Sequence, residues 1–460
     1  MTSTVTNPVN NPDNEPGQRT ADQPLAVGFD QHYSIGRAIP LGGQHLLALN
    51  GLWVFPISLG AGLHLDNVQT SFLIQGCFLL TGLVTLLSST KVLKLPIVQG
   101  PTAALLVALI AGGSAFGLDA AFGSMVVAGL LSAVLAFPLK RLGLYGHIAQ
   151  FVGNPLVFGT MFLVLGAQLA QIGVGGWFTD SAGMPLGAAL ATGIVTIVVV
   201  ALCMIFGGKT IIKTAAVLWG IAVGAIVAAV LGVWQLPDLS GTLVLGPPHL
   251  LPFGFKLEWA LVPLMMVGFL QAASESMGVY SLLGRIGGER IDVDRANRGL
   301  FVEFIGSSIG GLFGGIGTTS YPENVGVLRV TGIASRVVTA TAGVIAIVVS
   351  FLPPVALFLA SLPTPAMYGA ATVLFGIIAF SGVQQLAVVK WDNLNLLVAA
   401  LCFTVPVGLQ AIPAGVAEGL PESVSSILTS PMMVSTIMLL VLHPLINFGV
   451  RPLLERRRAA

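Results

Sequence analysis

The chain has 460 residues, of which 55% are hydrophobic and only 8% are charged, and its formal net charge is +1 at pH 7. Soluble domains carry about 25% charged residues, so this composition excludes a soluble protein, and the near-zero net charge argues against nucleic acid as a partner. Cys77, Cys203 and Cys402 lie far apart in apolar runs, without the spacing of metal ligands. The composition is typical of a polytopic membrane protein.

The N-terminal 38 residues are polar and rich in Asn, Pro, Asp and Gln. They lack the apolar core of roughly 7–15 residues that a signal peptide has, and we predict a disordered cytoplasmic tail over residues 1–38. Beyond this tail, apolar stretches of roughly 20 residues, the length that crosses a bilayer, recur as far as Val450. The predicted spans are 39–61, 67–90, a broken 95–113, 119–139, 148–173, 184–206, 212–234, 257–283, 297–316, a broken 318–332, 336–360, 366–387, 392–411 and 430–450.

The basic residues support about fourteen spans. If the N-terminal tail is cytoplasmic, each even-numbered span ends in the cytoplasm, where Lys and Arg should follow it. Outside the tail, only Lys256 and Arg329 depart from this pattern. We therefore predict a multi-pass protein of the cell inner (plasma) membrane with cytoplasmic N- and C-termini, the latter a basic tail over 454–460. The residues that follow the pattern are Lys91, Lys94, Lys140, Arg141, Lys209, Lys213, Arg285, Arg290, Arg295, Arg298, Arg336, Lys390, Arg451, Arg456, Arg457 and Arg458.

One broken segment occupies the third place in each half of seven spans: 95–113 in the first half and 318–332 in the second. A repeat with an odd number of spans inverts the second half relative to the first, which is the plan of many secondary transporters. Interrupted segments at matching places are the best sequence pointer to a transporter's binding site. We therefore predict an all-α polytopic membrane protein of two inverted seven-segment repeats, with short strands or half-helices at the third and tenth spans.

Two acidic residues lie well inside predicted spans: Glu275 in the eighth, and Glu323 at the break of the tenth. An acid at membrane depth costs on the order of 2.5–3.5 kcal/mol on insertion scales and is a functional candidate by default. Two carboxyl groups facing one cavity suit a planar heterocycle with N–H donors, whose carbonyl oxygens can meet backbone N–H groups at the breaks. Since desolvation favours a neutral carboxyl group, either acid could carry a proton with the solute. Capping of the broken segment is the structural alternative for Glu323.

The stretch Glu323-Asn324-x-Gly326-x4-Thr331-Gly332 resembles the signature of the nucleobase–ascorbate transporter family. The likeness covers about residues 37–453 and implies a homodimeric secondary transporter, not an enzyme, without a cofactor. Such proteins take up uracil, xanthine, urate or a related base in symport with a proton or, in some branches, sodium. Further resemblances lie at Gln44-His45, Gln99-Gly100 and Glu275-x-x-Gly278.

The resemblance also implies a core domain and a gate domain, each in two parts. The core would comprise residues 39–140 and 251–362 (spans 1–4 and 8–11), and the gate residues 141–250 and 363–453 (spans 5–7 and 12–14). Antiparallel strands at the third and tenth spans would hold the base between them. His45, Glu275 and Glu323 are the candidates for proton coupling. The candidate substrate-binding residues are Gln99, Thr102, Ala103, Glu275, Tyr321, Pro322, Glu323 and Asn324.

Three positions depart from the family's pattern. Val279 stands where uracil carriers place a histidine, so proton coupling would fall to the two acids. Pro322 has no N–H group to donate to the base, and Ala103 replaces an aromatic that often covers it. Glutamate at the first signature position fits uracil carriers, whereas Glu-Ser-x-Gly in the eighth span is more purine-like, so the base stays open.

Several alternatives remain at this point. His45 could be a buried, hydrogen-bonded packing residue, Asn324 could satisfy loose backbone ends, and Gln99 could have a structural role. A channel is a second functional class, because broken helices and acids also build selectivity filters. A carrier of another small planar or anionic solute on the same fold is a third, although two buried acids would repel an anion.

Overall fold

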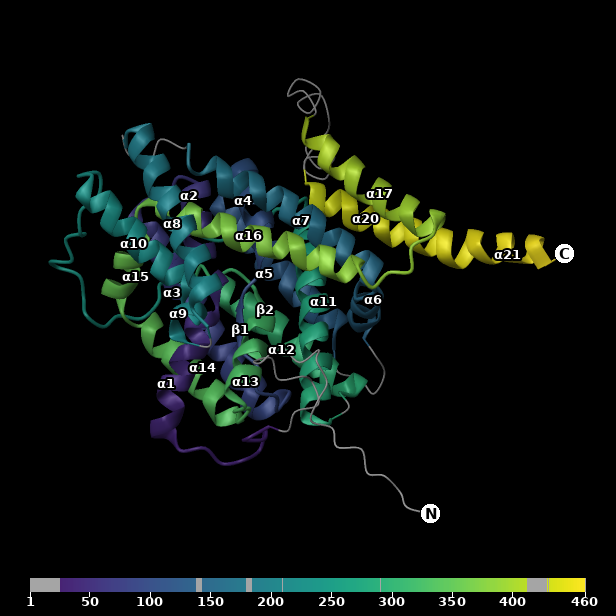
Figure 1. Cartoon of the computed structure of the whole chain (residues 1–460), viewed down its shortest axis with the longest axis horizontal. Helices are drawn as coiled ribbons and strands as arrows, with labels where there is room; N and C mark the ends of the chain where they lie inside the picture. Colours follow the sequence, from purple (N-terminus) through teal and green to yellow (C-terminus); the bar gives the residue numbers. More distant parts are fainter. Residues whose placement is uncertain are drawn as a thin grey trace, which may run out of the picture.

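The computed structural model describes residues 25–137, 143–178, 184–208, 210–289, 291–411, 428 and 430–459. Helices dominate it and surround one short strand pair (Figure 1). The elements before residue 250 are α1 (Ile35–Ala48), α2 (Asn50–Gly62), α3 (Asn67–Leu87), a π-helical turn (Ser88–Val92), β1 (Gln99–Pro101), α4 (Ala103–Phe116), α5 (Leu118–Leu135), α6 (Leu144–Val152), α7 (Pro155–Gly175), α8 (Leu186–Phe206), α9 (Ile211–Thr214) and α10 (Ala216–Val230).

The second part of the chain repeats the pattern of long helices around one short strand. Its elements are α11 (Val262–Gly287), α12 (Val293–Gly311), β2 (Thr318–Ser320), α13 (Pro322–Thr331), α14 (Arg336–Ser350), α15 (Pro353–Ala360), α16 (Thr364–Leu386), α17 (Asn393–Gly408), a 3₁₀ turn (Leu409–Ala411), α20 (Pro431–Pro444), a π-helical turn (Leu445–Val450) and α21 (Arg451–Ala459).

Every predicted span has a helical counterpart in the same order, and several of these are bent or split. The first corresponds to α1 and α2, which meet at 46°, and the eleventh to α14 and α15, which meet at 83°. The second bend falls where Pro353 opens α15, since the residue before a proline avoids the helical conformation. The expectation of one continuous fifth span over 148–173 is wrong, because the Asn154 side chain caps α7 and Pro155 occupies its first turn.

Seven of the described helices are long and apolar enough to cross a membrane, or up to nine if each bent pair counts as one span. Two further helices, α11 (26 residues) and α12 (19 residues), are long but more polar, and the remaining segments are shorter or interrupted, as expected for the two broken ones. The finding supports a protein with many membrane-spanning helices. The count of fourteen crossings and the inverted repeat stay predictions.

The two predicted tails differ in what the structure describes of them. In the predicted N-terminal tail, residues 1–24 lie outside the described residues. Further along it, Val27 forms a parallel β-bridge with Ile333, so the chain joins the folded body before the predicted boundary at residue 38. The basic segment 454–460, predicted as a tail, continues the last helix as far as α21 is described.

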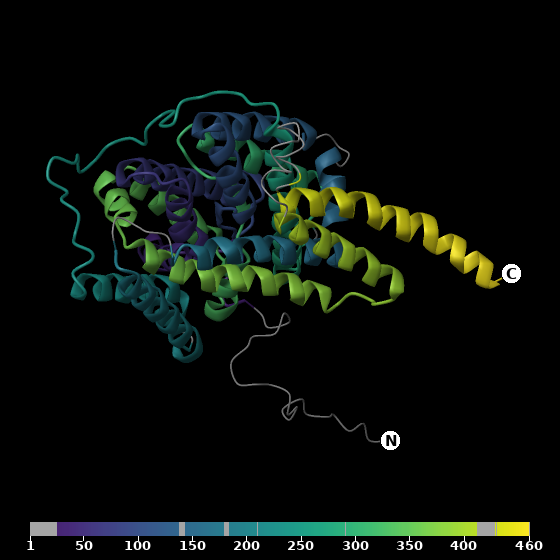
Figure 2. The same cartoon turned by 90° about the horizontal axis from the view of Figure 1, so that it is seen from above.

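The helices pack in two groups. In one group α3 packs against α14 and α15, and α5 against α11 and α12; in the other α7 packs against α16, α17 and α20, and α8 against α10 and α16. Figures 1 and 2 both show α7 and α16 side by side, with α21 projecting from the body. These two groups would correspond to the core and gate domains that the resemblance implies. Their behaviour as separate moving domains stays a prediction.

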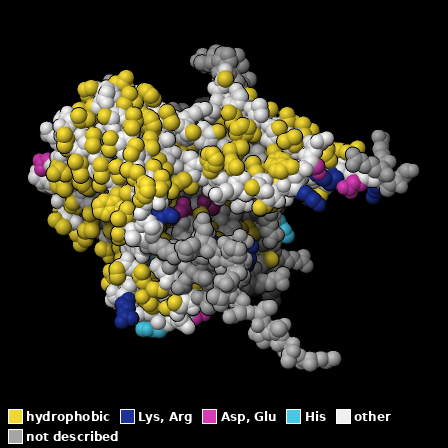
Figure 3. Space-filling model, in the orientation of Figure 1, with side chains coloured by type: hydrophobic (Ala, Val, Ile, Leu, Met, Phe, Trp, Pro, Cys, Tyr) yellow, Lys and Arg dark blue, Asp and Glu magenta, His cyan; other side chains and the backbone are white. Residues whose placement is uncertain are grey.

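Small residues allow close helix contacts in the first group. A Cβ atom on Gly82 of α3 would lie 2.6 Å from the carbonyl oxygen of Gly343 on α14. Association in lipid relies on such close backbone packing, because lipid tails are as apolar as the side chains. The surface supports a lipid environment as well, since hydrophobic side chains cover much of the face in Figure 3 and only a few charged ones show, some near its middle and the others at its edges.

Candidate functional site

The two broken segments meet as a pair of antiparallel strands at the centre of the first group. Gln99 of β1 lies opposite Ser320 of β2, and Pro101 opposite Thr318. All residues of both strands are buried. Irregular backbone at membrane depth needs partners inside the protein, and this ladder supplies them.

Each strand leads directly into a short helix. After β1, the Thr102 hydroxyl accepts a hydrogen bond from the Ala104 amide at 3.4 Å and caps α4. After β2, Pro322 occupies the first turn of α13, where its missing N–H group costs nothing. Because the strands are antiparallel and only three residues long, the two helix N-termini begin at opposite ends of the ladder. Their unpaired N–H groups give this region positive partial charge.

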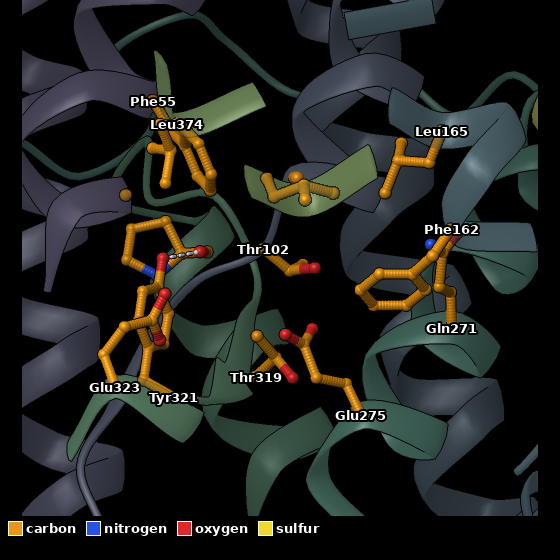
Figure 4. Close-up of a pocket in the computed structure, with 14 residues that line it drawn as sticks. Phe55, Thr102, Phe162, Leu165, Gln271, Glu275, Thr319, Tyr321, Glu323 and Leu374 are labelled. Atoms are coloured by element: carbon orange, nitrogen blue, oxygen red, sulfur yellow. Dashed lines mark hydrogen bonds between the residues drawn. The ribbon is translucent and has the colours of Figure 1, made fainter. Parts of the chain in front are cut away.

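A cavity lies beside the strand pair, with about 430 Å³ of empty space including its mouth. Both helix groups contribute to its wall. In the first group α2 packs against α3, α4 and α11 pack against α5, and α13 contacts α11, while α7 and α16 belong to the other group. The lining residues are Gly51, Phe55, Pro101, Thr102, Ala103, Phe162, Leu165, Gln271, Glu275, Thr319, Tyr321, Glu323, Leu374 and Ile378 (Figure 4).

The two acids predicted from the sequence both line this cavity. Glu275 lies midway along α11 and Glu323 in the first turn of α13, and both are partly buried. Figure 4 shows their carboxyl groups approaching from two sides, with Thr319 of β2 between them. The Glu323 Oε2 atom has no hydrogen-bond partner among the described residues. The cavity therefore presents hydrogen-bonding groups that the surrounding protein does not satisfy.

Tyr321 connects the two broken segments. Its hydroxyl donates a hydrogen bond to the carbonyl oxygen of Pro101 at 2.5 Å, the dashed line in Figure 4. Two glycines make room for the ring: a Cβ atom on Gly51 would lie 1.9 Å from the Tyr321 hydroxyl, and one on Gly100 would lie 2.8 Å from its ring. Tyr321 thus fixes α13 to the end of β1. With Thr102 and Ala103, it is among the predicted residues that line the cavity.

Four other predicted residues lie outside the cavity lining: Pro322, Asn324, Gln99 and His45. Asn324 is buried and its Oδ1 atom lies 2.7 Å from Nδ1 of His45, which joins α13 to α1. His45 is only 1% exposed, so its position agrees with the hydrogen-bonded packing role given as its alternative. Pro322 is exposed at the start of α13. Their roles in binding and coupling stay predictions.

A third buried acid, Glu303 of α12, was not selected from the sequence. It is fully buried and accepts hydrogen bonds from the Ser276 hydroxyl at 2.8 Å, from Gln99 Nε2 at 3.1 Å and from the Tyr280 hydroxyl at 3.3 Å. Gln99 also donates to the Ser320 hydroxyl at 2.8 Å. This network joins both strands to α11 and α12 behind the cavity. Its sequence signal was weaker than that of the other two acids, because Glu303 lies near the inner end of its predicted span and not deep inside it.

The part of the wall formed by α7 and α16 carried no sequence signal. Phe162 and Leu165 of α7, with Leu374 and Ile378 of α16, are apolar residues on apolar spans and look the same whether they face lipid or a cavity. Gln271 of α11, in the wall formed by the first helix group, did carry a signal, because it is an amide inside a predicted span. Its place in the lining became evident only from the structure.

Comparison with known proteins gives consistent matches over nearly the whole chain. The sequence model of the Permease family (Xan_ur_permease) matches residues 36–415. The chain is 27% identical to the nucleobase transporter PlUacP of Paenibacillus larvae, over 90% of this chain and 95% of that protein. It is 28% identical to the uric acid transporter UacT of Escherichia coli, over 91% and 88%. It is 29% identical to the uracil permease of Bacillus caldolyticus, over 82% and 86%.

Solved transporter structures share the fold at low sequence identity. The transmembrane domain of the cyanobacterial bicarbonate transporter BicA superposes with a TM-score of 0.55 at 15% identity, covering 90% of this chain and 99% of that one. The murine anion transporter Slc26a9, in an inward-facing state, gives 0.59 at 12% identity, covering 89% and 70%. At these identities the likeness extends to the fold alone.

Proposed function

Because the chain belongs to the nucleobase–ascorbate transporter family, whose members are permeases and not enzymes, we propose that it is a secondary active transporter that takes up a nucleobase. The base is uracil or a purine such as xanthine or urate, and the coupled ion is a proton. The observation that carries the proposal is the pair of carboxyl groups, Glu275 and Glu323, on either side of one cavity at the break of the chain.

The cavity's polar groups match the edge of a nucleobase. A carboxylate accepts hydrogen bonds from ring N–H groups, and a protonated carboxyl group can in addition donate one. The N-terminal amides of α4 and α13 lie at the two ends of the strand ladder, where they can donate to carbonyl oxygens of the base. The apolar remainder of the lining, including Phe55 and Phe162, suits the faces of a flat ring.

Proton coupling follows from the same groups. A carboxyl group cut off from water prefers its neutral form, and a bound base displaces water from the cavity. Binding of the base and protonation of one of the two acids therefore favour each other. When the cavity opens to the cytoplasm and water returns, base and proton leave together.

Alternating access is the transport mechanism in this proposal. The acids belong to one helix group, while Phe162 and Leu374 belong to the other. A displacement of the two groups against each other would open the cavity first to one side and then to the other. A homodimer in the plasma membrane, with both termini in the cytoplasm, remains part of the proposal.

The lining distinguishes this function from transport of an inorganic anion on the same fold. Among the described residues that line the cavity there is no Lys, Arg or His, and two are acids. Such a wall repels a permanently charged anion and accepts a neutral or protonated heterocycle. The likeness to bicarbonate and anion transporters therefore does not extend to their cargo.

Uptake into proteoliposomes tests the proposal. Purified protein is reconstituted with a proton gradient, inside alkaline, and uptake of labelled uracil, xanthine and urate is measured beside Glu275→Gln and Glu323→Gln. We expect uptake of at least one base that collapses with a protonophore, counterflow of that base, and loss of uptake in both variants. Glu455→Gln, on the exposed last helix, is the matched control and should behave as wild type. Normal transport by both cavity variants would refute the site, and flux without counterflow would indicate a channel.

A further inference from the structure

Gln271 is a buried amide with no partner in the described part of the protein. Its side chain is 1% exposed and lines the cavity, and neither Oε1 nor Nε2 makes a hydrogen bond to a described residue. Buried polar groups in native proteins are nearly always paired, so each exception needs an explanation. A ligand that enters the cavity would supply the missing partners.

The position of Gln271 continues the polar wall that Glu275 begins. The two residues are four apart on α11, so they lie on the same helix face, about 6 Å apart along the axis. Figure 4 shows Glu275 beside Thr319, and Gln271 further along the wall beside Phe162. The cavity thus has two polar regions on α11, one at Glu275 and one at Gln271, and only the region at Glu275 faces Glu323.

The two regions differ in chemistry. A carboxylate only accepts hydrogen bonds, whereas a carboxamide presents one acceptor oxygen and two donors. Gln271 can therefore pair with an N–H group and a neighbouring carbonyl or ring nitrogen at the same time. A single six-membered ring held between the two acids would leave this amide unpaired and buried, at a cost in free energy.

Phe162 supplies an apolar face at the same end of the cavity. It comes from α7 in the other helix group and is 6% exposed. Its ring stacks on Phe158 with 4.1 Å between centroids and 25° between planes, which fixes its orientation. Since Ala103 offers no aromatic surface, Phe162 is well placed to cover a flat ring beside Gln271.

Building on the proposed function, we propose that Gln271 and Phe162 form a second subsite, which takes the five-membered ring of an oxopurine while the acids hold its six-membered ring. The protein then prefers purines that carry N–H and carbonyl groups, such as xanthine or urate, to uracil. Such a base pairs with the amide that a pyrimidine leaves unsatisfied. The preference is thus built into α11, one helical turn from Glu275.

The test compares wild type with Gln271→Met, which keeps the length of the side chain and removes the amide. Labelled xanthine uptake is measured in proteoliposomes, with unlabelled xanthine, urate and uracil as competitors. We expect the KM for xanthine and the inhibition constant for urate to rise about tenfold, which corresponds to the loss of about one to two hydrogen bonds. The inhibition constant for uracil should change less than about twofold, since uracil does not reach this amide. Gln171→Met, an exposed glutamine of α7 bonded to Gln410, is the matched control and should leave all three values unchanged.

A melting experiment in detergent distinguishes a ligand-binding amide from a structural one. Replacing an unpaired buried amide by an apolar group of similar shape is neutral or stabilising. Ligand-free Gln271→Met should therefore melt at or above the wild-type temperature, while the increase in melting temperature produced by xanthine becomes smaller. A lower melting temperature without ligand would show a structural role and overturn the inference.

The transport results separate the two proposals. If wild type carries none of the three bases, the transport proposal fails and this inference fails with it. If wild type carries a base but prefers uracil, or if Gln271→Met weakens purines and uracil equally or not at all, only the second subsite is refuted. Selective loss of purine affinity supports it.

Discussion

The contact between Gly51 and Tyr321 gives a sharp test of how the broken segments form the cavity. A Cβ atom at Gly51 would lie 1.9 Å from the Tyr321 hydroxyl, whereas Cβ atoms essentially never come closer than 3.0 Å to another heavy atom. The Gly51→Ala variant must therefore push the tyrosine by about 1 Å or displace α2. Either movement disturbs the 2.5 Å hydrogen bond from Tyr321 to Pro101, which joins the start of α13 to the end of β1.

The expected effect of Gly51→Ala is on transport and not on helix formation. Alanine favours a helix by roughly 0.5–1 kcal/mol relative to glycine, so α2 itself should not be weakened. A misplacement of about 1 Å at a site can lower its efficiency about 100-fold, and we expect kcat/KM for base uptake to fall by about 10- to 100-fold. The assay is initial-rate uptake in proteoliposomes, normalised to the amount of folded protein. Gly43→Ala on α1 is the matched control, since no atom lies within 4 Å of its added Cβ position.

A double variant tests the cause. The new methyl group collides most closely with the Tyr321 hydroxyl and less closely with the Phe55 ring, at 2.7 Å. Tyr321→Phe removes the closer collision, so Gly51→Ala combined with Tyr321→Phe should transport better than Gly51→Ala alone. Contacting residues show such non-additive effects, whereas independent ones add. Wild-type uptake by Gly51→Ala, or a double variant in which the two losses simply add, would refute the view that this contact positions α13.

Three further predictions concern buried contacts outside the cavity lining. Gln99→Leu removes two buried hydrogen bonds behind the strands and should lower both the melting temperature and the uptake rate; unchanged values would contradict a network role. Asn324→Leu leaves His45 unpaired and should cost about 1–3 kcal/mol, whereas replacing both residues by leucine should cost less; a double variant that melts lower than either single one would argue against this pairing. Gly82→Ala should reduce the yield of folded protein, because its Cβ atom would collide with α14, and normal yield would contradict the close packing of these helices.

The broken segments and their acids could be predicted because they violate the rule that the rest of the chain follows. A membrane helix satisfies its own backbone, so the run from Thr318 to Gly332, with its proline, acid and amide, stands out against the apolar sequence around it. The antiparallel strand pair and the common cavity of Glu275 and Glu323 agree with that prediction. The basic residues that follow alternate spans supported the count of about fourteen spans, which stays a prediction.

There is a physical reason why the residues that pack against the broken segments could not be predicted. Lipid and protein interior are similarly apolar, so hydropathy does not tell which face of α7 or α16 turns inward. Phe162 is therefore indistinguishable in sequence from its lipid-facing neighbours. Glu303 and Gln271 had a weak signal as polar groups inside spans. Their different places, one in a paired network and one unpaired in the cavity, depend on packing between α11, α12 and the strands.

The charges around the cavity link the acidity of the base to the proton that accompanies it. The only ionisable side chains among the described lining residues are Glu275, Glu323 and Tyr321, and positive partial charge comes from the N-terminal ends of α4 and α13. A purine acidic enough to lose its proton would meet two acids, so it enters readily only if a proton comes with it. Urate is a stronger acid than xanthine, and its uptake should therefore fall more steeply as the external pH is raised. Parallel pH profiles for the two purines would show that the acids do not sense the charge of the base, and would separate proton coupling from base recognition.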